Sequence, residues 1–443
     1  MKTRTRALVL MFAAAAAILG APGCARKPAP ADLVFLNGDF FTVDPAHPSA
    51  RAVAINGNTI TAVCDSDREA RRYVGPKTRV FDLLGKFVLP GLIDAHVHFA
   101  AAGALINGAN LLSVSDEAGL RKEIRRVVDL LDDGEWITDG LWGAYEQWAL
   151  GDAGLAPKDK KAPWRPNRTM IDDLTPEHPC FLCRFDRKEW LANGAALAAS
   201  GLGQQRLAGL EIGPDGKPTG IVLPGTPAYD RIRKAIAPKS DMRLLDESRA
   251  ALQALREAGI TEIHDIETPA QTRRFIELEK NGELTCRVWL RPDLSRGAEL
   301  KAQGYAMGLH PGTKQKSDRL RYGPLAGERA FRPSVGSDWP GTGAAIHDLK
   351  PSDLIWAAVT GKAPKGLPED AIHAYTINNA AAAFEDGALG SLTPGKRADI
   401  TVLDKNLLKI APEDILTVKV THTVVDGRIV FRRRVPAPAR PSR

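Results

Sequence analysis

The two ends of the chain carry the same β-strand pattern, and an alternation of helices and strands lies between them. Asn-Gly pairs at positions 37 and 56 interrupt apolar–polar alternation near the start, and an Asp-Gly pair at position 426 does so near the end. Such pairs between alternating strands are the strongest short-range signal of a β-hairpin. We therefore expect residues 32–90 and 397–434 to pair into one composite β-sandwich built from both chain ends.

The middle of the chain alternates between helix and strand. The strand-like segments 261–266 and 286–292 each follow an amphipathic helical pattern. This alternation predicts a parallel sheet, and we expect residues 91–396 to form an α/β barrel. Residues of about 112–235 interrupt it with tryptophan- and proline-rich stretches. We interpret them as an insertion above the barrel mouth, where loops that contact substrate usually lie.

The N-terminus has the form of an export signal. Residues 1–23 join a basic start to an apolar run that is too short to span a bilayer. The run ends in small residues before Cys24 and resembles the cleavage box of bacterial lipoproteins, although Ala21 stands where leucine is usual. Cleavage without acylation is the alternative. Both predict an exported protein, either free in the periplasm or anchored to a membrane only through Cys24, with residues 24–31 as a tether.

Composition excludes two classes of function. The net charge of +7 is spread out, and the proline-rich end at 435–443, which we expect to be disordered, inflates it. No basic stripe with interleaved aromatics occurs, so we expect no nucleic-acid partner. The pair Cys180 and Cys183 lacks a second pair at zinc-site spacing. Positions three apart in a strand face opposite sides, so we interpret both as buried structural thiols.

Two histidines at the end of an apolar run are the first candidates for chemistry. His96 and His98, in "LPGLIDAHVHF", would project from one face of a strand, and the C-terminal end of a barrel strand opens into the active-site mouth. Neutral imidazole is a good zinc ligand. Asp338, in "SVGSDWPG", is a candidate metal-adjacent carboxylate and general base. The alternative for Asp338 is a turn or helix-capping residue.

With these motifs the chain resembles the amidohydrolase superfamily, in the branch that includes N-substituted formamide deformylases. Six segments carry the resemblance: "ADLVFLNGDFFTVDPAHPSARAVAINGNTITAV", "FVLPGLIDAHVHF", "EAGITEIHD", "GSDWPG", "HAYTINNAAAAFED" and "GSLTPGKRADITVLD". They are spread over nearly the whole mature chain. The resemblance implies a (β/α)8 metal-dependent hydrolase barrel with a composite β-sandwich. It also implies a divalent metal, usually zinc, and hydrolysis of non-peptide carbon–nitrogen bonds in a small-molecule substrate.

The resemblance also implies a ligand set that this sequence contains only in part. In that superfamily five strands supply the ligands of the metal. The first strand supplies an HxH pair, the fourth a lysine or an acid, the fifth and the sixth a histidine each, and the eighth an aspartate. His96, His98 and Asp338 match the first and last of these. "RLRYGPLAG" resembles the fourth strand, with Ala326 at the lysine position, and the eighth-strand motif follows almost at once. We therefore predict an internally truncated barrel that lacks about three βα units, on the order of a hundred residues.

Other histidines were weighed as replacements for the missing ligands. His264 ends the second-strand pattern and is a candidate substitute ligand. His310 precedes the region of the predicted truncation, and we interpret it as a solvated loop histidine rather than a replacement ligand. His347 follows the Asp338 turn and could lie near the mouth. The remaining histidines have loop, helix or sandwich contexts without a catalytic pattern: His47, His178, His373 and His422. Lys188 stands where the superfamily usually has a histidine that contacts substrate.

Two hypotheses follow. In the first, His96 and His98 bind one zinc ion and Asp338 activates water for attack on a carbon–nitrogen substrate. In the second, the chain is a catalytically impaired exported lipoprotein, a pseudoenzyme or deletion product that binds no metal and has a binding function or none. The missing middle ligands leave enzymatic activity open. A barrel short of strands exposes sheet edges, which predicts self-association.

Overall fold

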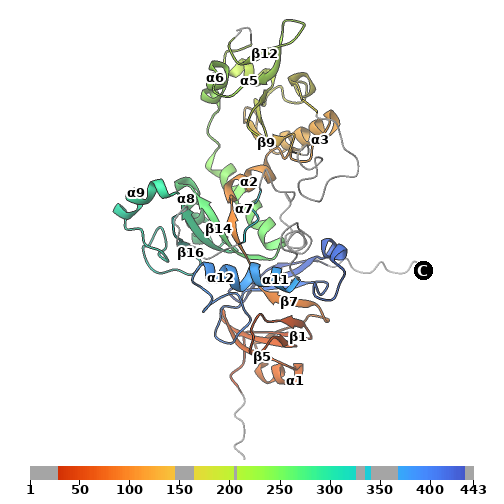
Figure 1. Ribbon diagram of the computed structural model, residues 1–443, viewed down its shortest axis with the longest axis vertical. Coiled ribbons are helices and arrows are strands. Elements are labelled where there is room, and N and C mark those ends of the chain that lie inside the picture. The colour runs from red at the N-terminus through yellow and green to blue at the C-terminus, as the bar shows by residue number, and fades with distance from the viewer. Residues whose placement is uncertain (1–27, 145–163, 204–206, 326–334, 341–367, 435–443) are drawn as a thin grey trace, which may run out of the picture.

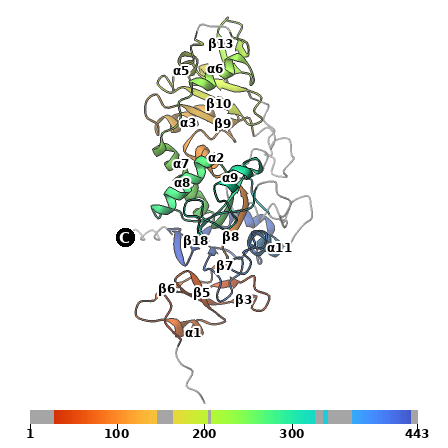
Figure 2. The ribbon, with the colours of Figure 1, turned by 90° about the vertical axis from the view of Figure 1, so that its left-hand side faces the viewer.

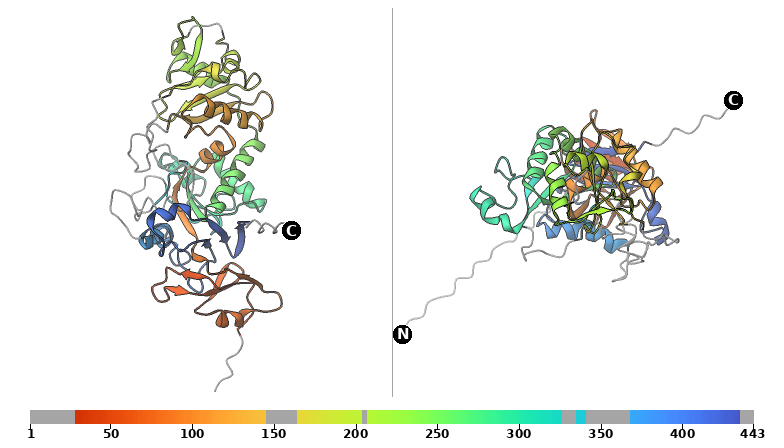
Figure 3. Two further views of the ribbon diagram at one scale, coloured as in Figure 1. Left: turned by 90° about the vertical axis from the view of Figure 1, so that its right-hand side faces the viewer. Right: turned by 90° about the horizontal axis from the view of Figure 1, so that it is seen from above.

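The computed structural model describes residues 28–144, 164–203, 207–325, 335–340 and 368–434. Three regions follow one another along the long axis of the molecule: a pair of β-sheets, a parallel sheet with helices, and a separate smaller sheet (Figure 1). Two views from opposite sides show the same stacking (Figures 2 and 3). None of the helices in these ranges is long and apolar enough to cross a membrane.

Several predicted features lie outside the described residues. They are the signal peptide at 1–23, the lipidation site Cys24, Ala326 at the fourth-strand lysine position, His347, and the tail at 435–443.

The first region consists of two packed sheets. The four-stranded sheet has the order β5-β4-β1-β6, and the six-stranded sheet has the order β19-β18-β17-β7-β2-β3. The strands of the first are β1 (Leu33–Leu36), β4 (Ala52–Asn56), β5 (Thr59–Cys64) and β6 (Arg79–Asp82). Those of the second are β2 (Asp39–Phe41), β3 (Ser49–Ala50), β7 (Phe87–Pro90), β17 (Ile400–Leu403), β18 (Val420–Val425) and β19 (Arg428–Arg432).

The six-stranded sheet contains strands from both ends of the chain. β17 pairs antiparallel with β7, so that Val402 lies opposite Val88. One buried apolar cluster joins the two sheets, with Phe35 and Ile55 from the first packed against Val88 and Val402 from the second. The short helix α1 (Asp67–Ala70) closes the outer end of this region.

The second region is built on four parallel strands in the order β16-β15-β14-β8. They are β8 (Leu92–Val97), β14 (Ile260–Glu267), β15 (Arg287–Pro292) and β16 (Leu320–Tyr322). On the free side of β8, Trp339 forms one parallel bridge to Val97. Within the ranges that the structure describes, the sheet therefore has four strands and one bridged position, and no eight-stranded ring is seen. The mixed α/β class is confirmed, whereas the loss of about three βα units stays a prediction.

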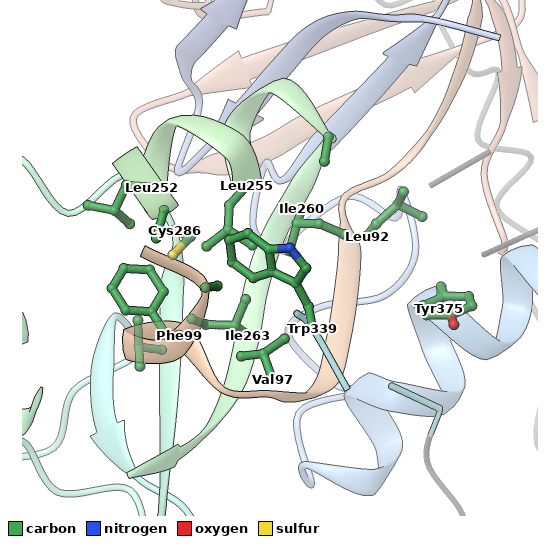
Figure 4. Close-up of a cluster of buried hydrophobic side chains, with 14 of the residues drawn as sticks. Leu92, Val97, Phe99, Leu252, Leu255, Ile260, Ile263, Cys286, Trp339 and Tyr375 are labelled. Carbon is green, nitrogen blue, oxygen red and sulfur yellow. The ribbon is translucent and has the colours of Figure 1, made fainter. Parts of the chain in front are cut away.

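Helices cover the outer face of this sheet. They are α2 (Phe99–Asn107), α7 (Asp241–Glu257), α8 (Pro269–Lys280) and α9 (Gly297–Ala302). Ile263 of β14 and Val97 of β8 pack against Leu255 of α7 and Phe99 of α2, with Trp339 beside them (Figure 4). The π-helical turn at Ala374–Asn378 and α12 (Asn379–Ala382) pack against β8, and α11 (Pro368–His373) leads into that turn. The sheet thus has an apolar outer face toward its helices.

The segment that we interpret as an insertion has a sheet of its own, in the order β12-β13-β11-β10-β9. Its elements are α3 (Glu117–Val128), β9 (Ile137–Trp142), β10 (Cys180–Arg184), β11 (Trp190–Ala192), α5 (Gly194–Ala199), β12 (Leu210–Ile212), β13 (Pro218–Val222) and α6 (Pro227–Ala235). Cys180 and Cys183 are buried in β10 and form no disulfide. Burial raises the pKa of both thiols to about 12, so each is a protonated packing residue.

Candidate metal centre

The last residues of β8 carry the two histidines of the HxH motif. Between Asp94 and Val97 the register of β8 against β14 shifts by one residue, which is a β-bulge. Bulges re-aim side chains and are frequent next to active sites. His98 then caps α2, whose first N–H, that of Phe99, donates to the Asp265 carboxylate at 2.8 Å. His96 therefore projects from a strand end and His98 from a helix start.

A short segment that runs beside β8 delivers Asp338 to these histidines. The Asp338 N–H donates to the His96 carbonyl at 2.9 Å, and the His98 N–H donates to the Trp339 carbonyl at 2.8 Å. Asp338 has a φ of 58°, in the left-handed region that aspartate tolerates better than most residues. Two backbone hydrogen bonds and one unusual φ thus fix where the Asp338 carboxylate points.

The three side chains converge on one point. The Nε2 atoms of His96 and His98 each lie 3.2 Å from Oδ1 of Asp338. Their ligand atoms all lie within 4.8 Å of one another. The side chains are 41%, 44% and 57% exposed for His96, His98 and Asp338, so a small molecule can reach them. Two imidazoles and one carboxylate with open positions are the donor set of many catalytic zinc sites, so these residues fit a divalent metal.

A buried carboxyl group supports the cluster from below. Asp94 is fully buried and accepts hydrogen bonds from the hydroxyl and N–H of Ser337, at 2.6 and 2.9 Å. It also accepts from the His96 N–H at 3.3 Å. Burial raises the pKa of Asp94 to about 6, although these hydrogen bonds act to lower it. Burial also lowers the pKa of His96 against the pull of Asp338, which favours the neutral imidazole that binds metals.

His264, the candidate substitute ligand, does not join this cluster. It is buried on β14, with its Nε2 atom 3.1 Å from Oε1 of Glu262 and its ring beside that of Trp289. Arg321 binds the other oxygen of Glu262 at 3.0 Å. A buried cluster of charged residues deeper in the sheet therefore holds the imidazole of His264, and its role as a substitute ligand stays a prediction.

The other described histidines and Lys188 also lie away from the cluster. His47 pairs with Asp65, His178 with the Glu135 carbonyl, and His310 with Glu279. His373 stacks on Phe41, and His422 is buried in β18. Lys188 is 80% exposed and lies 3.8 Å from Asp186.

Sequence reasoning missed three residues that shape the site: Asp94, Ser337 and Arg291. Asp94 had a usable signal, because it precedes His96 by two positions in a run that is otherwise apolar. Ser337 directly precedes Asp338, and only the pairing of its segment with β8 reveals its role. Arg291 lies nearly two hundred residues away from His96 in sequence, and its Nη1 atom lies 3.5 Å from the Ala95 carbonyl oxygen.

Comparison with known families agrees with this architecture. Residues 79–326 and 331–431 match the family model described as "Amidohydrolase family". This match covers most of the chain, so the chain belongs to the amidohydrolase family. The resemblance to the superfamily that the sequence motifs predict is confirmed.

The curated relatives match in part. The chain is 31% identical over 244 residues to Protein LONG AFTER FAR-RED 3 of Arabidopsis thaliana, covering 53% of this chain and 38% of that protein. It is 30% identical over 200 residues to N-substituted formamide deformylase of Arthrobacter pascens, covering 43% and 34%. It is 25% identical over 409 residues to imidazolonepropionase of Alkaliphilus metalliredigens, covering 85% and 89%. The chain therefore spans less than two-fifths of the length of the first two relatives.

A solved structure supports the fold. The chain superposes on an uncharacterized metal-dependent hydrolase from Pyrococcus furiosus with a TM-score of 0.59 and 17% identity. The superposition covers 85% of this chain and all of that one. At this identity the likeness shows the fold alone.

Proposed function

We propose that this chain is a metal-dependent hydrolase that cleaves a non-peptide carbon–nitrogen bond of a small molecule. The observation that carries the proposal is the convergence of His96, His98 and Asp338 within 4.8 Å at the exposed end of a parallel sheet. Membership of the amidohydrolase family supports it, because relatives include a deformylase and deaminases. His96, His98 and Asp338 would hold one divalent ion, with zinc as the expected metal.

The residues divide the chemistry between them. A divalent ion, when bound, supplies Lewis acidity toward the substrate carbonyl. The Asp338 carboxylate lies between the two imidazoles and is more than half exposed, so it can accept a proton from an attacking water and return it to the leaving nitrogen. Asp94 and Ser337 hold the segment that carries Asp338 against β8. The imidazole nitrogens of His96 and His98 would hold the ion.

A second function is favoured by a specific observation. The family match is interrupted at residues 327–330, where the fourth-strand and eighth-strand resemblances adjoin. This supports an internally truncated barrel without the middle ligands. The alternative is therefore a catalytically impaired member that binds a small molecule or has lost its function.

Metal content separates the two functions. The mature protein, His96→Ala and the control His47→Ala, which removes a histidine that pairs with Asp65 away from the cluster, are analysed by elemental analysis. The hydrolase predicts about one zinc per chain in the first and the control, and none in His96→Ala. No metal in any of them would favour the impaired member. Retained zinc without hydrolysis of N-substituted formamides or cyclic amides would leave only a binding function.

We further propose that the chain is exported and that lipid on Cys24 is its only membrane contact. The basis is the sequence alone: a signal-like N-terminus followed by small residues before the cysteine. Labelled palmitate supplied to expressing cells should enter the wild-type chain and not Cys24→Ala. Equal labelling of both would contradict acylation at this residue.

We also propose that the chain self-associates through β16. In the described part of the chain β15 is the only strand that pairs with β16, although Gly308 and Leu309 form backbone hydrogen bonds with Tyr322 on its other edge. A strand with one partner strand can recruit a strand of another chain. Sedimentation equilibrium should show a concentration-dependent dimer or larger species. A monomer at all concentrations would contradict it.

A further inference from the structure

A cavity of about 460 Å³ lies on the inner face of the parallel sheet, next to β16. Trp289 of β15 and Arg321 of β16 line it, and both side chains are buried. Their neighbours in each strand belong to the apolar outer face, so Trp289 and Arg321 project to the inner face. The walls come from residues 307–308 after α9, residues 316–318 before β16 and residues 383–385 after α12. The residues of the candidate metal centre are not among the described residues that line this cavity.

Each of the two buried side chains has an N–H donor without an acceptor. Within the described ranges, Nε1 of Trp289 and Nε of Arg321 are buried atoms with no hydrogen-bond partner. The Nη2 atom of Arg321 is already used, because it binds the carboxylates of Glu262 and Glu385. Buried polar groups in folded proteins almost always have a partner. Two unpaired donors on neighbouring strands beside one cavity therefore indicate an acceptor that comes from outside the chain.

The indole group of Trp289 is held firmly in place. His264 of β14, Trp289 and Arg321 are paired in register across three parallel strands. The ring centroids of His264 and Trp289 lie 5.3 Å apart, and the guanidinium carbon of Arg321 lies 5.3 Å from the centroid of the indole ring. Because neighbours on both sides fix the indole, a ligand would not have to order it on binding.

Apolar side chains stand at the rim of the cavity. Phe384 is 53% exposed and Met307 is 50% exposed, and both line the cavity. Phe384 has a φ of 59°, a backbone conformation that bulky residues rarely adopt. Exposed apolar surface next to buried donors is the composition of many small-molecule sites, in which apolar walls surround a few polar groups.

The charges around the buried donors favour a neutral ligand. Arg321 already shares its positive charge between two acidic side chains, and Asp318 at the wall contacts Arg397. Lys316 lines the cavity but is exposed to solvent, which screens its charge. A carboxylate at the buried donors would lie beside Glu262 and Glu385 and be repelled by them. A carbonyl oxygen accepts hydrogen bonds without adding a charge.

We propose that this cavity is a second binding site, which takes a neutral carbonyl compound with an apolar or aromatic body. The carbonyl oxygen accepts hydrogen bonds from Nε1 of Trp289 and Nε of Arg321, and the body packs against Phe384 and Met307. The site needs no metal, so it is independent of the proposed hydrolase function. Water is the competing occupant, since it would also satisfy the donors, but water makes no use of the apolar rim.

The indole N–H of Trp289 is a direct reporter of this site. The chain has eight tryptophans, so their indole signals form a small set in a ¹⁵N–¹H NMR spectrum. Trp289→Phe identifies the signal at the cavity, and the control Trp142→Phe identifies another buried indole N–H without a partner, in β9 of the insertion. Benzamide and its charged partner benzoate are titrated into the zinc-loaded and the metal-free full chain.

We expect benzamide to move the Trp289 signal downfield, with and without zinc, and to leave the Trp142 signal in place. Trp289→Phe keeps the aromatic surface and loses the donor, so it should bind benzamide about fivefold more weakly. Trp142→Phe should bind benzamide like the wild type. Benzoate should bind more weakly than benzamide to every chain that keeps Trp289.

A second pair of variants tests the apolar rim without touching the buried donors. Phe384→Asn removes the aromatic ring and places asparagine, which tolerates a positive φ, at this position. Leu84→Asn is the matched control, because Leu84 is also an exposed apolar residue with a positive φ, at 55°, but lies in the packed pair of sheets. Phe384→Asn should weaken benzamide binding, and Leu84→Asn should not.

The contrary outcomes are distinct. No movement of the Trp289 signal at saturating benzamide means that only water occupies the cavity, and it overturns the site. Unchanged affinity in both Trp289→Phe and Phe384→Asn does the same. Movement that requires zinc places the probe at the metal centre instead and overturns a second site. Benzoate that binds as tightly as benzamide overturns the neutral ligand class.

Discussion

One arginine on the inner face of the parallel sheet contacts two carboxyl groups, the buried Glu262 of β14 and the partly buried Glu385 that follows α12. Arg321, 1% exposed, donates to Glu262 at 3.0 Å and also contacts Glu385. Burial would raise the pKa of Glu262, but Arg321 and His264 lower it to about 2. Burial and the charge of Glu262 raise the pKa of Glu385 to about 7. Glu262 is thus the ionised partner of the arginine, and Glu385 is the group that titrates near neutral pH.

Replacing Glu385 by glutamine should change how stability depends on pH. The folded chain holds the Glu385 proton up to a pKa of about 7, whereas the unfolded chain loses it near 4.5. The wild type therefore loses stability as pH rises through this window, and Glu385→Gln does not. The variant should gain about 3 kcal/mol relative to the wild type between pH 4.5 and pH 8. Urea unfolding of both chains at these two pH values measures the gain, and a constant difference would contradict it.

At the level of single residues, the sequence predicts the residues of the motifs but not the residues that hold them in place. His96, His98 and Asp338 stand out because short apolar runs and turn residues frame them, and the structure brings them together. Asp94 and Arg291 come close to the motif only because of the bulge in β8 and the parallel register of β14 and β15. Both features depend on strands that are far apart in the chain. No local pattern encodes those contacts.

The segment at 335–340 is the element that completes the candidate site. It lies so close to β8 that Gly336 has no space for a side chain: a Cβ there would lie 2.5 Å from both the N and Cβ atoms of His96. The Ala95 N–H donates to the Val335 carbonyl at 3.3 Å, and the Asn379 side chain binds the backbone of Val335. The close approach is what lets Asp338 reach the histidines.

Gly336→Ala should therefore separate Asp338 from the histidines. The added methyl group has to push the segment away from β8, and overpacking of this kind costs about 1–3 kcal/mol. We expect weaker zinc retention together with a lower free energy of unfolding. Gly387→Ala is the matched control, because a Cβ at that turn meets nothing within 4 Å. Wild-type zinc retention in Gly336→Ala would show that the close approach is not needed.

Among the elements, those with a strong pattern were predicted well. The strands expected at 261–266 and 286–292 coincide with β14 and β15, because each is a short strand-like segment that directly follows an amphipathic helix. The five-stranded sheet of the insertion was not predicted. Two of its strands have only three residues, and β9 pairs parallel with β10 across a long intervening segment, so alternation gave no usable signal.

At the scale of the whole molecule, a buried arginine joins the parallel sheet to the packed pair of sheets. Arg287 of β15 is 1% exposed and donates to Asp399, at the start of β17, at 2.7 Å. It also contacts Asp426, in the turn between β18 and β19, and donates to the Asp318 carbonyl at 2.6 Å. The two regions are therefore held together by buried charge as well as by apolar packing.

Arg287→Met should destabilise the chain strongly. The change leaves the buried Asp399 carboxylate without its cation, and breaking a buried ion pair costs about 3–5 kcal/mol. Because the loss comes from the stranded charge, the double variant Arg287→Met/Asp399→Asn should be no less stable than Arg287→Met alone. Chemical unfolding of Arg287→Met, Asp399→Asn and the double variant measures the coupling, and additive losses would contradict this account.

The order of the strands in the six-stranded sheet has a consequence for how the protein is made. β17 occupies an interior position between β7 and β18, although it is synthesised long after β7. Only Gly91 separates β7 from β8, so the strand that carries His96 is joined directly to a sheet whose last strands are synthesised at the end of the chain. Contacts this distant in sequence form slowly. The two histidines of the candidate metal centre are then held in place only after the last strands are made, and a chain released early would carry both on a strand without its neighbouring sheet.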